Sequence, residues 1–193
     1  MIEVNDLHKS FGKVKVLNGI HLEYHPGKIY GLVGENGAGK TTLFNCIMGI
    51  YDYTGSITKS KTLKTGYLSA SNFFYSQITG FEHLEFCMKA KGLPVNTPTI
   101  QHLNEIFQLP LDRYAAEYST GMKKKLGFMA LLLQDNDVFI LDEPFNGVDL
   151  KGCILMKRLI RQLKAKEKTV IISSHLIASL REICDIIHYL NEG

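Results

Sequence analysis

The segment 34–42, Gly-Glu-Asn-Gly-Ala-Gly-Lys-Thr-Thr, constrains the fold of this chain more than any other. It matches the pattern G-x-x-x-x-G-K-[ST] without a mismatch. The apolar residues 28–33 predict a short buried strand before it, and residues 42–48 predict a helix with an apolar face after it. In a strand, loop and helix of this kind, successive backbone N–H groups and the positive end of the helix dipole converge on one concavity. The segment therefore predicts a phosphate-binding loop.

The loop also predicts which residues hold a nucleotide. Lys40 is expected to reach the β- and γ-phosphates, and the Thr41 hydroxyl is expected to bind Mg²⁺. A glycine-rich turn with a chance lysine is the alternative, and the flanking strand and helix argue against it. The other loop residues expected to contact the nucleotide are Gly34, Asn36, Gly37, Ala38, Gly39 and Thr42.

Two further buried strands indicate the fold class. Residues 137–141 and 169–173 are intensely apolar, and an amphipathic helix pattern over 150–165 joins them. Strands buried on both faces that alternate with helices imply a parallel α/β sheet. Residues 2–7 and 20–24 alternate about a turn that contains Gly12, which predicts an antiparallel β flap. Residues 80–133 are mostly helical in period, with breaks at 92–94, 97–98 and 109–110.

Composition limits the possible partners. With 193 residues and a net charge of +3, the chain suits one domain, and nothing in it demands a nucleic-acid partner. No apolar run approaches the length of a membrane span, and the N-terminus lacks the pattern of a signal peptide, so a cytoplasmic protein is expected. The four cysteines lie far apart without a Cys-x-x-Cys pair and are expected to be reduced core thiols.

Acidic residues and a histidine follow the two apolar strands. Asp142 and Glu143 end the first strand, at the edge where α/β folds place their ligands. Asp142 can bind Mg²⁺, and Glu143 can orient or deprotonate a water that attacks the γ-phosphate. Alone, an Asp-Glu pair is more often a solvated turn, but the phosphate loop upstream favours the catalytic interpretation. His175 follows the second strand and can link the γ-phosphate to Glu143, whereas the other six histidines are expected to be structural.

The phosphate loop, the apolar strand that ends in Asp142 and Glu143, and His175 follow one another as in the ATP-binding subunit of an ABC transporter. The chain resembles that family from residue 2 to the end. The resemblance implies a P-loop NTPase core with a mostly parallel sheet, an N-terminal antiparallel β flap and an inserted helical subdomain. Within a single domain, the core would span about 1–70 and 134–193, and the helical subdomain about 71–133. It also implies that ATP and Mg²⁺ are the cofactors and that Phe11 stacks on adenine, although a partly buried strand aromatic is the alternative.

Residues 118–122, Tyr-Ser-Thr-Gly-Met, occupy the place of the family signature Leu-Ser-Gly-Gly-Gln. The resemblance implies that Ser119 and Gly121 face the ATP of a partner subunit in a head-to-tail homodimer, and that Asp149 lies in a loop at the dimer interface. Thr120 departs from the family pattern, and so does Ala70, where the family has Gln or Glu.

The implied function is ATP hydrolysis that powers a separate membrane permease of export type, at the inner face of the cell membrane. Residues 72–75, with Phe81 and Phe86, are expected either to form an aromatic surface for that permease or to be a satellite of the core. The three lysines 123–125 are expected to be a solvated basic face beside the nucleotide. A soluble ABC-type ATPase that acts on DNA or ribosomes, and a nucleotide-gated module with little turnover, remain the alternatives.

Overall fold

The computed structural model describes residues 1–71 and 73–191; residue 72, the first of the predicted aromatic stretch, and residues 192 and 193 lie outside the described part. A five-stranded parallel sheet forms the centre of the protein, with the strand order β5-β6-β7-β3-β8. All residues of β3, β6 and β7 are buried, which confirms the prediction of strands covered on both faces. The strands are β3 (Ile29–Val33), β5 (Thr65–Leu68), β6 (Val138–Leu141), β7 (Thr169–Ser174) and β8 (Ile186–Tyr189).

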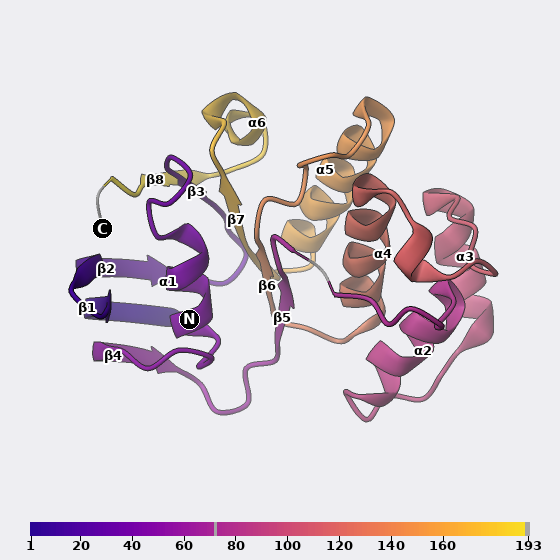
Figure 1. Ribbon diagram of the computed structural model, residues 1–193, viewed down its shortest axis with the longest axis horizontal. Coiled ribbons are helices and arrows are strands. Elements are labelled where there is room, and N and C mark those ends of the chain that lie inside the picture. The colour runs from indigo at the N-terminus through magenta and orange to yellow at the C-terminus, as the bar shows by residue number, and fades with distance from the viewer. Residues whose placement is uncertain (72, 192–193) are drawn as a thin grey trace.

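The predicted N-terminal flap is an antiparallel sheet of three strands. β1 (Ile2–Phe11) pairs with β2 (Val14–Tyr24) across the turn at Gly12, and β4 (Thr54–Lys59) pairs with the other edge of β1. β4 was not predicted because it lacks an apolar alternation: five of its six residues are exposed. The flap lies at one end of the long axis of the molecule (Figure 1).

Three helices inserted between β5 and β6 lie together at the other end of the long axis (Figure 1). They are α2 (Gly80–Lys89), α3 (Thr97–Phe107) and α4 (Thr120–Leu133), with a short 3-10 turn at Ala115–Glu117 before α4. The break predicted at 97–98 coincides with the start of a helix, because α3 begins at Thr97. The Asn96 side chain caps the helix by accepting a hydrogen bond from Thr99 N at 3.0 Å, and Pro98 lies in the first turn, where its missing N–H costs nothing.

The other helices flank the central sheet. α1 (Lys40–Ile47) begins two residues earlier than predicted, whereas α5 (Leu150–Ala165) has the predicted bounds, and α6 (Ile177–Arg181) follows β7. No helix within residues 1–71 and 73–191 is long and apolar enough to span a membrane.

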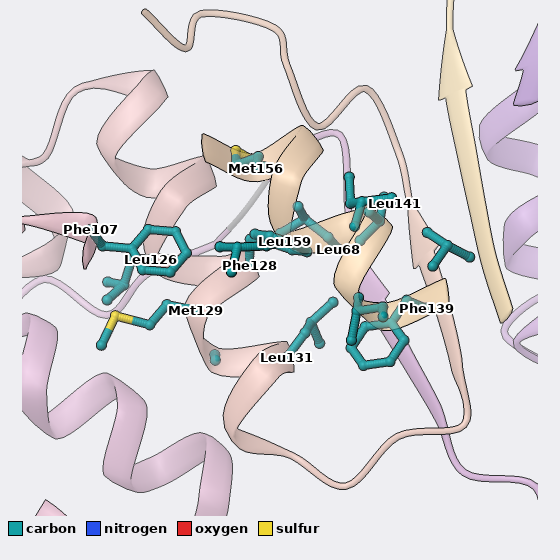
Figure 2. Packing of buried hydrophobic residues seen from close by; sticks show 14 of the residues in the cluster. Leu68, Phe107, Leu126, Phe128, Met129, Leu131, Phe139, Leu141, Met156 and Leu159 are labelled. Atoms are coloured by element: carbon teal, nitrogen blue, oxygen red, sulfur yellow. The ribbon is translucent and has the colours of Figure 1, made fainter. Parts of the chain in front are cut away.

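Two hydrophobic clusters lie on opposite faces of the sheet. Phe139 and Leu141 of β6 belong to the cluster shared with α4 and α5, which Figure 2 shows around Phe128. Val138 and Ile140, the alternate residues of the same strand, belong to the cluster shared with the flap and α1. The period of two along a strand produces this division, and it holds the end of β6 between two packed layers.

Candidate active site

The phosphate loop joins β3 to α1 with the backbone that the sequence predicted. Gly37 and Gly39 have φ angles of 90° and 99°. These positive values are rarely adopted by residues that have a side chain. Lys40 is 6% exposed, and its ammonium donates hydrogen bonds to the carbonyl oxygens of Gly34 at 2.6 Å and Glu35 at 2.9 Å. A cavity of about 310 Å³ lies against this loop. It is lined by Asn36, Gly37, Gly39, Lys40, Thr41, Thr42, Ala70, Asp142, Glu143 and Asn146.

Asp142 lies at the floor of this site with its carboxylate fully buried. One carboxylate oxygen accepts a hydrogen bond from the Thr41 hydroxyl at 2.6 Å, and the other accepts one from the Ser173 hydroxyl at 2.5 Å. A hydroxyl and a carboxylate are hard oxygen ligands, and Mg²⁺ in nucleotide sites uses one or two such protein groups beside phosphates and water. The donor set therefore fits Mg²⁺.

Glu143 follows directly, in a strained backbone conformation. Its φ angle of 46° lies in the left-handed region, which costs a residue other than glycine about 1–3 kcal/mol and is typical of functional sites. One carboxylate oxygen lies 3.1 Å from His175 Nδ1. The other is buried without a hydrogen-bond partner among the described residues, 3.7 Å from Lys40 Nζ. A carboxylate oxygen without a hydrogen-bond partner in the described part of the chain, on a residue that lines the phosphate cavity, suits a group that accepts a proton from water.

Ser173 is a site residue that the sequence reasoning missed. Its hydroxyl donates to Asp142 and accepts a hydrogen bond from Glu143 N at 2.9 Å, so one side chain holds both acids. The signal was present in the strand register: Leu141 pairs with Ile172 in parallel strands, which brings the next residue of β7 beside Asp142. Reading that register requires knowing that β6 and β7 are neighbours.

We expect Ser173→Ala to lower the turnover number for ATP about tenfold, because the substitution leaves the partly buried Glu143 N–H without a partner at a cost of about 1–3 kcal/mol. The melting temperature should fall as well, by a few degrees, because the lost hydrogen bonds also stabilise the folded protein. Steady-state phosphate release measures the effect. Ser174→Ala is the matched control, because Ser174 bonds to Ser179 and Leu176 instead. Equal turnover in Ser173→Ala and the wild type would contradict the assignment.

Phe11 and the signature residues do not line the phosphate cavity. Phe11 ends β1 with its ring 47% exposed and edge-on to Tyr51, at a centroid distance of 5.5 Å. The flap touches the phosphate loop near Val16, whose carbonyl oxygen would lie 3.0 Å from a Cβ at Gly39. Phe11 therefore belongs to the sheet that borders the loop, and the Lys9 ammonium lies over its ring, 5.0 Å from the ring centre.

Ser119 and Gly121 begin helix α4. Ser119 is exposed and caps the helix by accepting a hydrogen bond from Met122 N at 3.2 Å. Gly121 is buried against the loop 146–149 of its own chain, where a Cβ would lie 2.3 Å from the carbonyl oxygen of Gly147. A glycine is required here by close approach of two backbones. Asp149 lies on the same loop, 3.6 Å from Lys125 Nζ.

The prediction of a solvated lysine face at 123–125 is wrong for Lys124, which is 3% exposed. Lys124 shares a helical stripe with the buried residues Gly121, Phe128 and Leu131, a three- and four-residue spacing that the sequence already displayed. Its ammonium donates hydrogen bonds to the carbonyl oxygens of Ser69 at 2.9 Å and Asp142 at 3.1 Å. Burial lowers the pKa of this ammonium to about 8, against the opposing charges of Asp142 and Glu143.

The aromatic stretch is divided between the surface and the core. Phe73, Tyr75 and Phe86 are exposed and meet edge to face, with centroid distances of 5.2 Å and 6.3 Å. Phe74 and Phe81 instead pack against the core cluster that contains α4. The surface formed by Phe73, Tyr75 and Phe86 is called the aromatic surface below.

Taken together, the parallel sheet, the glycine-rich loop and the acids at the end of β6 define a nucleotide-binding protein of the phosphate-loop class. Comparison with known proteins narrows this class. The family model for ABC transporters matches residues 17–146. The bacitracin transport ATP-binding protein BcrA of Enterococcus faecalis is 33% identical over 207 residues, which cover 100% of this chain and 67% of that protein. The lantibiotic transport ATP-binding protein SrtF of Streptococcus pyogenes is 30% identical, with 100% and 88% covered.

Solved structures agree with the sequence comparison. A structure described as the ATP-binding subunit of an ABC transporter superposes with a TM-score of 0.90 at 26% identity, covering 100% of this chain and 86% of that one. A dimeric ABC transporter cassette has the same fold, with a TM-score of 0.88 at 18% identity over 100% and 95% of the two chains. The chain belongs to the ABC transporter family, as one of its ATP-binding, ATP-hydrolysing subunits. Its relatives are transport proteins, so the two alternatives outside transport are not favoured.

Proposed function

We propose that two copies of this chain form a head-to-tail homodimer around two MgATP molecules and drive an export permease from the inner face of the membrane. The observation that carries the proposal is the convergence of Lys40, Thr41, Asp142 and Glu143 on one cavity beside the glycine-rich loop. The relatives named for bacitracin and lantibiotic transport support a cargo of that kind.

Within one subunit, the proposed roles follow from the contacts of each side chain. The loop N–H groups and Lys40 bind the phosphates, and Thr41 and Asp142 hold Mg²⁺, which neutralises phosphate charge when bound. Glu143 takes the proton of the attacking water through its unpartnered oxygen. His175 orients Glu143 through their 3.1 Å contact, and we assign to it the contact with the γ-phosphate.

Between subunits, the start of α4 closes the ATP site of the partner. The exposed hydroxyl of Ser119 and the N–H groups at the start of α4, to which Gly121 belongs, are proposed to form an anion-binding end. Phe11 supplies the adenine platform. We divide the subunit as expected from its sequence, into a core of about 1–70 and 134–193 and a helical subdomain of about 71–133 that carries Ser119.

The permease is proposed to bind at the aromatic surface. Phe73 is 76% exposed, and exposed clusters of large aromatic rings are typical of protein interfaces. A cavity of about 470 Å³ adjoins it, lined by Phe73 and by residues of β5, α2 and α4 that include His83 and Leu131. A permease bound there would contact β5 and α4 together. The loop after β5 lines the phosphate cavity through Ala70, and α4 begins after Ser119, which is proposed to contact the ATP of the partner.

Mixing two inactive variants tests the head-to-tail arrangement. Lys40→Ala removes a phosphate ligand, whereas Ser119→Asp keeps a good helix cap but places a negative charge against the γ-phosphate of the partner. Each variant alone should hydrolyse little ATP. Their equimolar mixture should regain activity, up to about a quarter of the wild-type rate, because half of random dimers are mixed and each mixed dimer has one intact site.

The control is a mixture of Lys40→Ala with the double variant Lys40→Ala/Ser119→Asp, in which no site has an intact phosphate loop. Activity in the first mixture alone supports a site shared by two subunits. No recovery in the first mixture, with both variants folded and the wild type active, would contradict the head-to-tail dimer.

A further inference from the structure

A buried lysine of α4 reaches the catalytic loop and has no place in the roles described so far. Lys124 is 3% exposed, although removing an ammonium from water is costly unless its donors are satisfied. Its two hydrogen bonds go to neutral carbonyl oxygens, those of Ser69 and Asp142. The helix therefore places an ammonium group inside the protein, where it holds the two loops that contain Ser69 and Asp142.

Both carbonyls directly precede residues that line the phosphate cavity. Ser69 precedes Ala70 in the loop after β5, and Asp142 precedes Glu143 in the loop after β6. Ala70 has only a methyl group, so its side chain cannot form a polar link between these loops. The ammonium of Lys124 provides such a link from the helix that begins at Ser119.

The peptide unit between Asp142 and Glu143 is held on both sides. Its carbonyl oxygen accepts the hydrogen bond from Lys124 at 3.1 Å, and its N–H donates to Ser173 Oγ at 2.9 Å. A peptide with both polar groups bonded to buried side chains cannot rotate without breaking one of these bonds. The orientation of this peptide determines where the Glu143 side chain begins, at the strained φ angle of 46°.

We infer that Lys124 is a positioning residue for ATP hydrolysis, which fixes the peptide before Glu143 and connects it to the signature helix. This inference rests on the proposed role of Glu143 as the base. A displacement of a reacting group by about 1 Å can lower a rate by about a hundredfold, so loss of this link should reduce turnover while leaving the phosphate ligands in place.

Lys124→Met tests the inference, because methionine fills much of the same space without a donor. We expect the turnover number to fall about tenfold to a hundredfold, with the KM for MgATP changed by no more than about twofold. Lys124→Gln, which can still donate one hydrogen bond, should lie between Lys124→Met and the wild type, and it serves if the methionine variant does not fold. Lys123→Met, the adjacent lysine on the same helix, should keep wild-type turnover.

The decisive measurement is the rate of single-turnover hydrolysis in a protein that also carries Glu143→Gln. If Lys124 acts through Glu143, adding Lys124→Met to this background should change the residual rate by no more than about twofold. An equal fractional loss in both backgrounds would assign Lys124 a general structural role and overturn the inference. Wild-type turnover in folded Lys124→Met and Lys124→Gln would also overturn it. Loss of the role of Glu143 itself would appear separately, as full activity in Glu143→Gln alone.

Discussion

Replacing Glu143 with glutamine is expected to reduce ATP hydrolysis by about 100- to 10,000-fold while preserving MgATP binding. Glutamine keeps the shape and the contact with His175 but cannot take the proton of the attacking water. The substitution removes the proposed proton acceptor. This acceptor is the carboxylate oxygen that has no hydrogen-bond partner within the described residues and lies 3.7 Å from Lys40 Nζ. Because ATP then stays intact, the proposed dimer should accumulate.

Two measurements check this result. Phosphate release gives the turnover number, and size-exclusion chromatography with MgATP gives the fraction of dimer. Glu35→Gln is the control, since Glu35 belongs to the loop but contacts Lys40 only through its backbone carbonyl. A Glu143→Gln protein that hydrolyses ATP at the wild-type rate would exclude Glu143 as the base, and one that stays monomeric with MgATP bound would contradict the dimer.

Replacing Lys40 with alanine is expected to weaken ATP binding about tenfold to 150-fold, because a hydrogen bond to a charged group contributes about 1.5–3 kcal/mol. In the structure this ammonium already lies inside the loop, bonded to the carbonyl oxygens of Gly34 and Glu35. The substitution should therefore also lower the melting temperature without nucleotide. The measured quantity is the additional rise in melting temperature that ATP produces, compared at equal ATP concentrations.

Lys61→Ala provides the control for loss of positive charge, because Lys61 is exposed in the loop after β4. It should show the full ATP-induced rise. Lys40→Met tests whether the length of the side chain matters without its charge, and it should bind as weakly as Lys40→Ala. An unchanged ATP-induced rise in both Lys40 variants would contradict the assignment of Lys40 as a phosphate ligand.

Much of the fold could be predicted because local patterns determine it. The phosphate loop, the buried strands β6 and β7 and helix α5 each have a period or a motif within about sixteen residues. β4 could not be predicted in this way, since its polar residues form a strand only by pairing with β1. The start of α3 was mistaken for a break because Pro98 both ends and begins helices, and only the cap by Asn96 distinguishes the two.

Site residues that belong to a sequence motif could be predicted. Site residues that are defined by their neighbours in the folded structure could not. Lys40, Thr41, Asp142 and Glu143 come together as expected, whereas Ser173 and Lys124 act through contacts between segments distant in sequence. A run of three lysines is usually solvated, and nothing in composition marks the middle one as buried. Its helical spacing from Phe128 and Leu131 does mark it, once the buried face of α4 is known.

The alternation of β6 between two hydrophobic clusters also limits how this protein can change. Phe139 and Leu141 are committed to one face, and Val138 and Ile140 to the other. Inserting or deleting a single residue in this strand would exchange the two sets and turn Asp142 and Glu143 toward the opposite face. The placement of the two acids therefore depends on how the hydrophobic side chains of β6 are divided between the two clusters. Exchanges of one hydrophobic residue for another within β6 should lower the stability of the protein before they lower its rate of ATP hydrolysis.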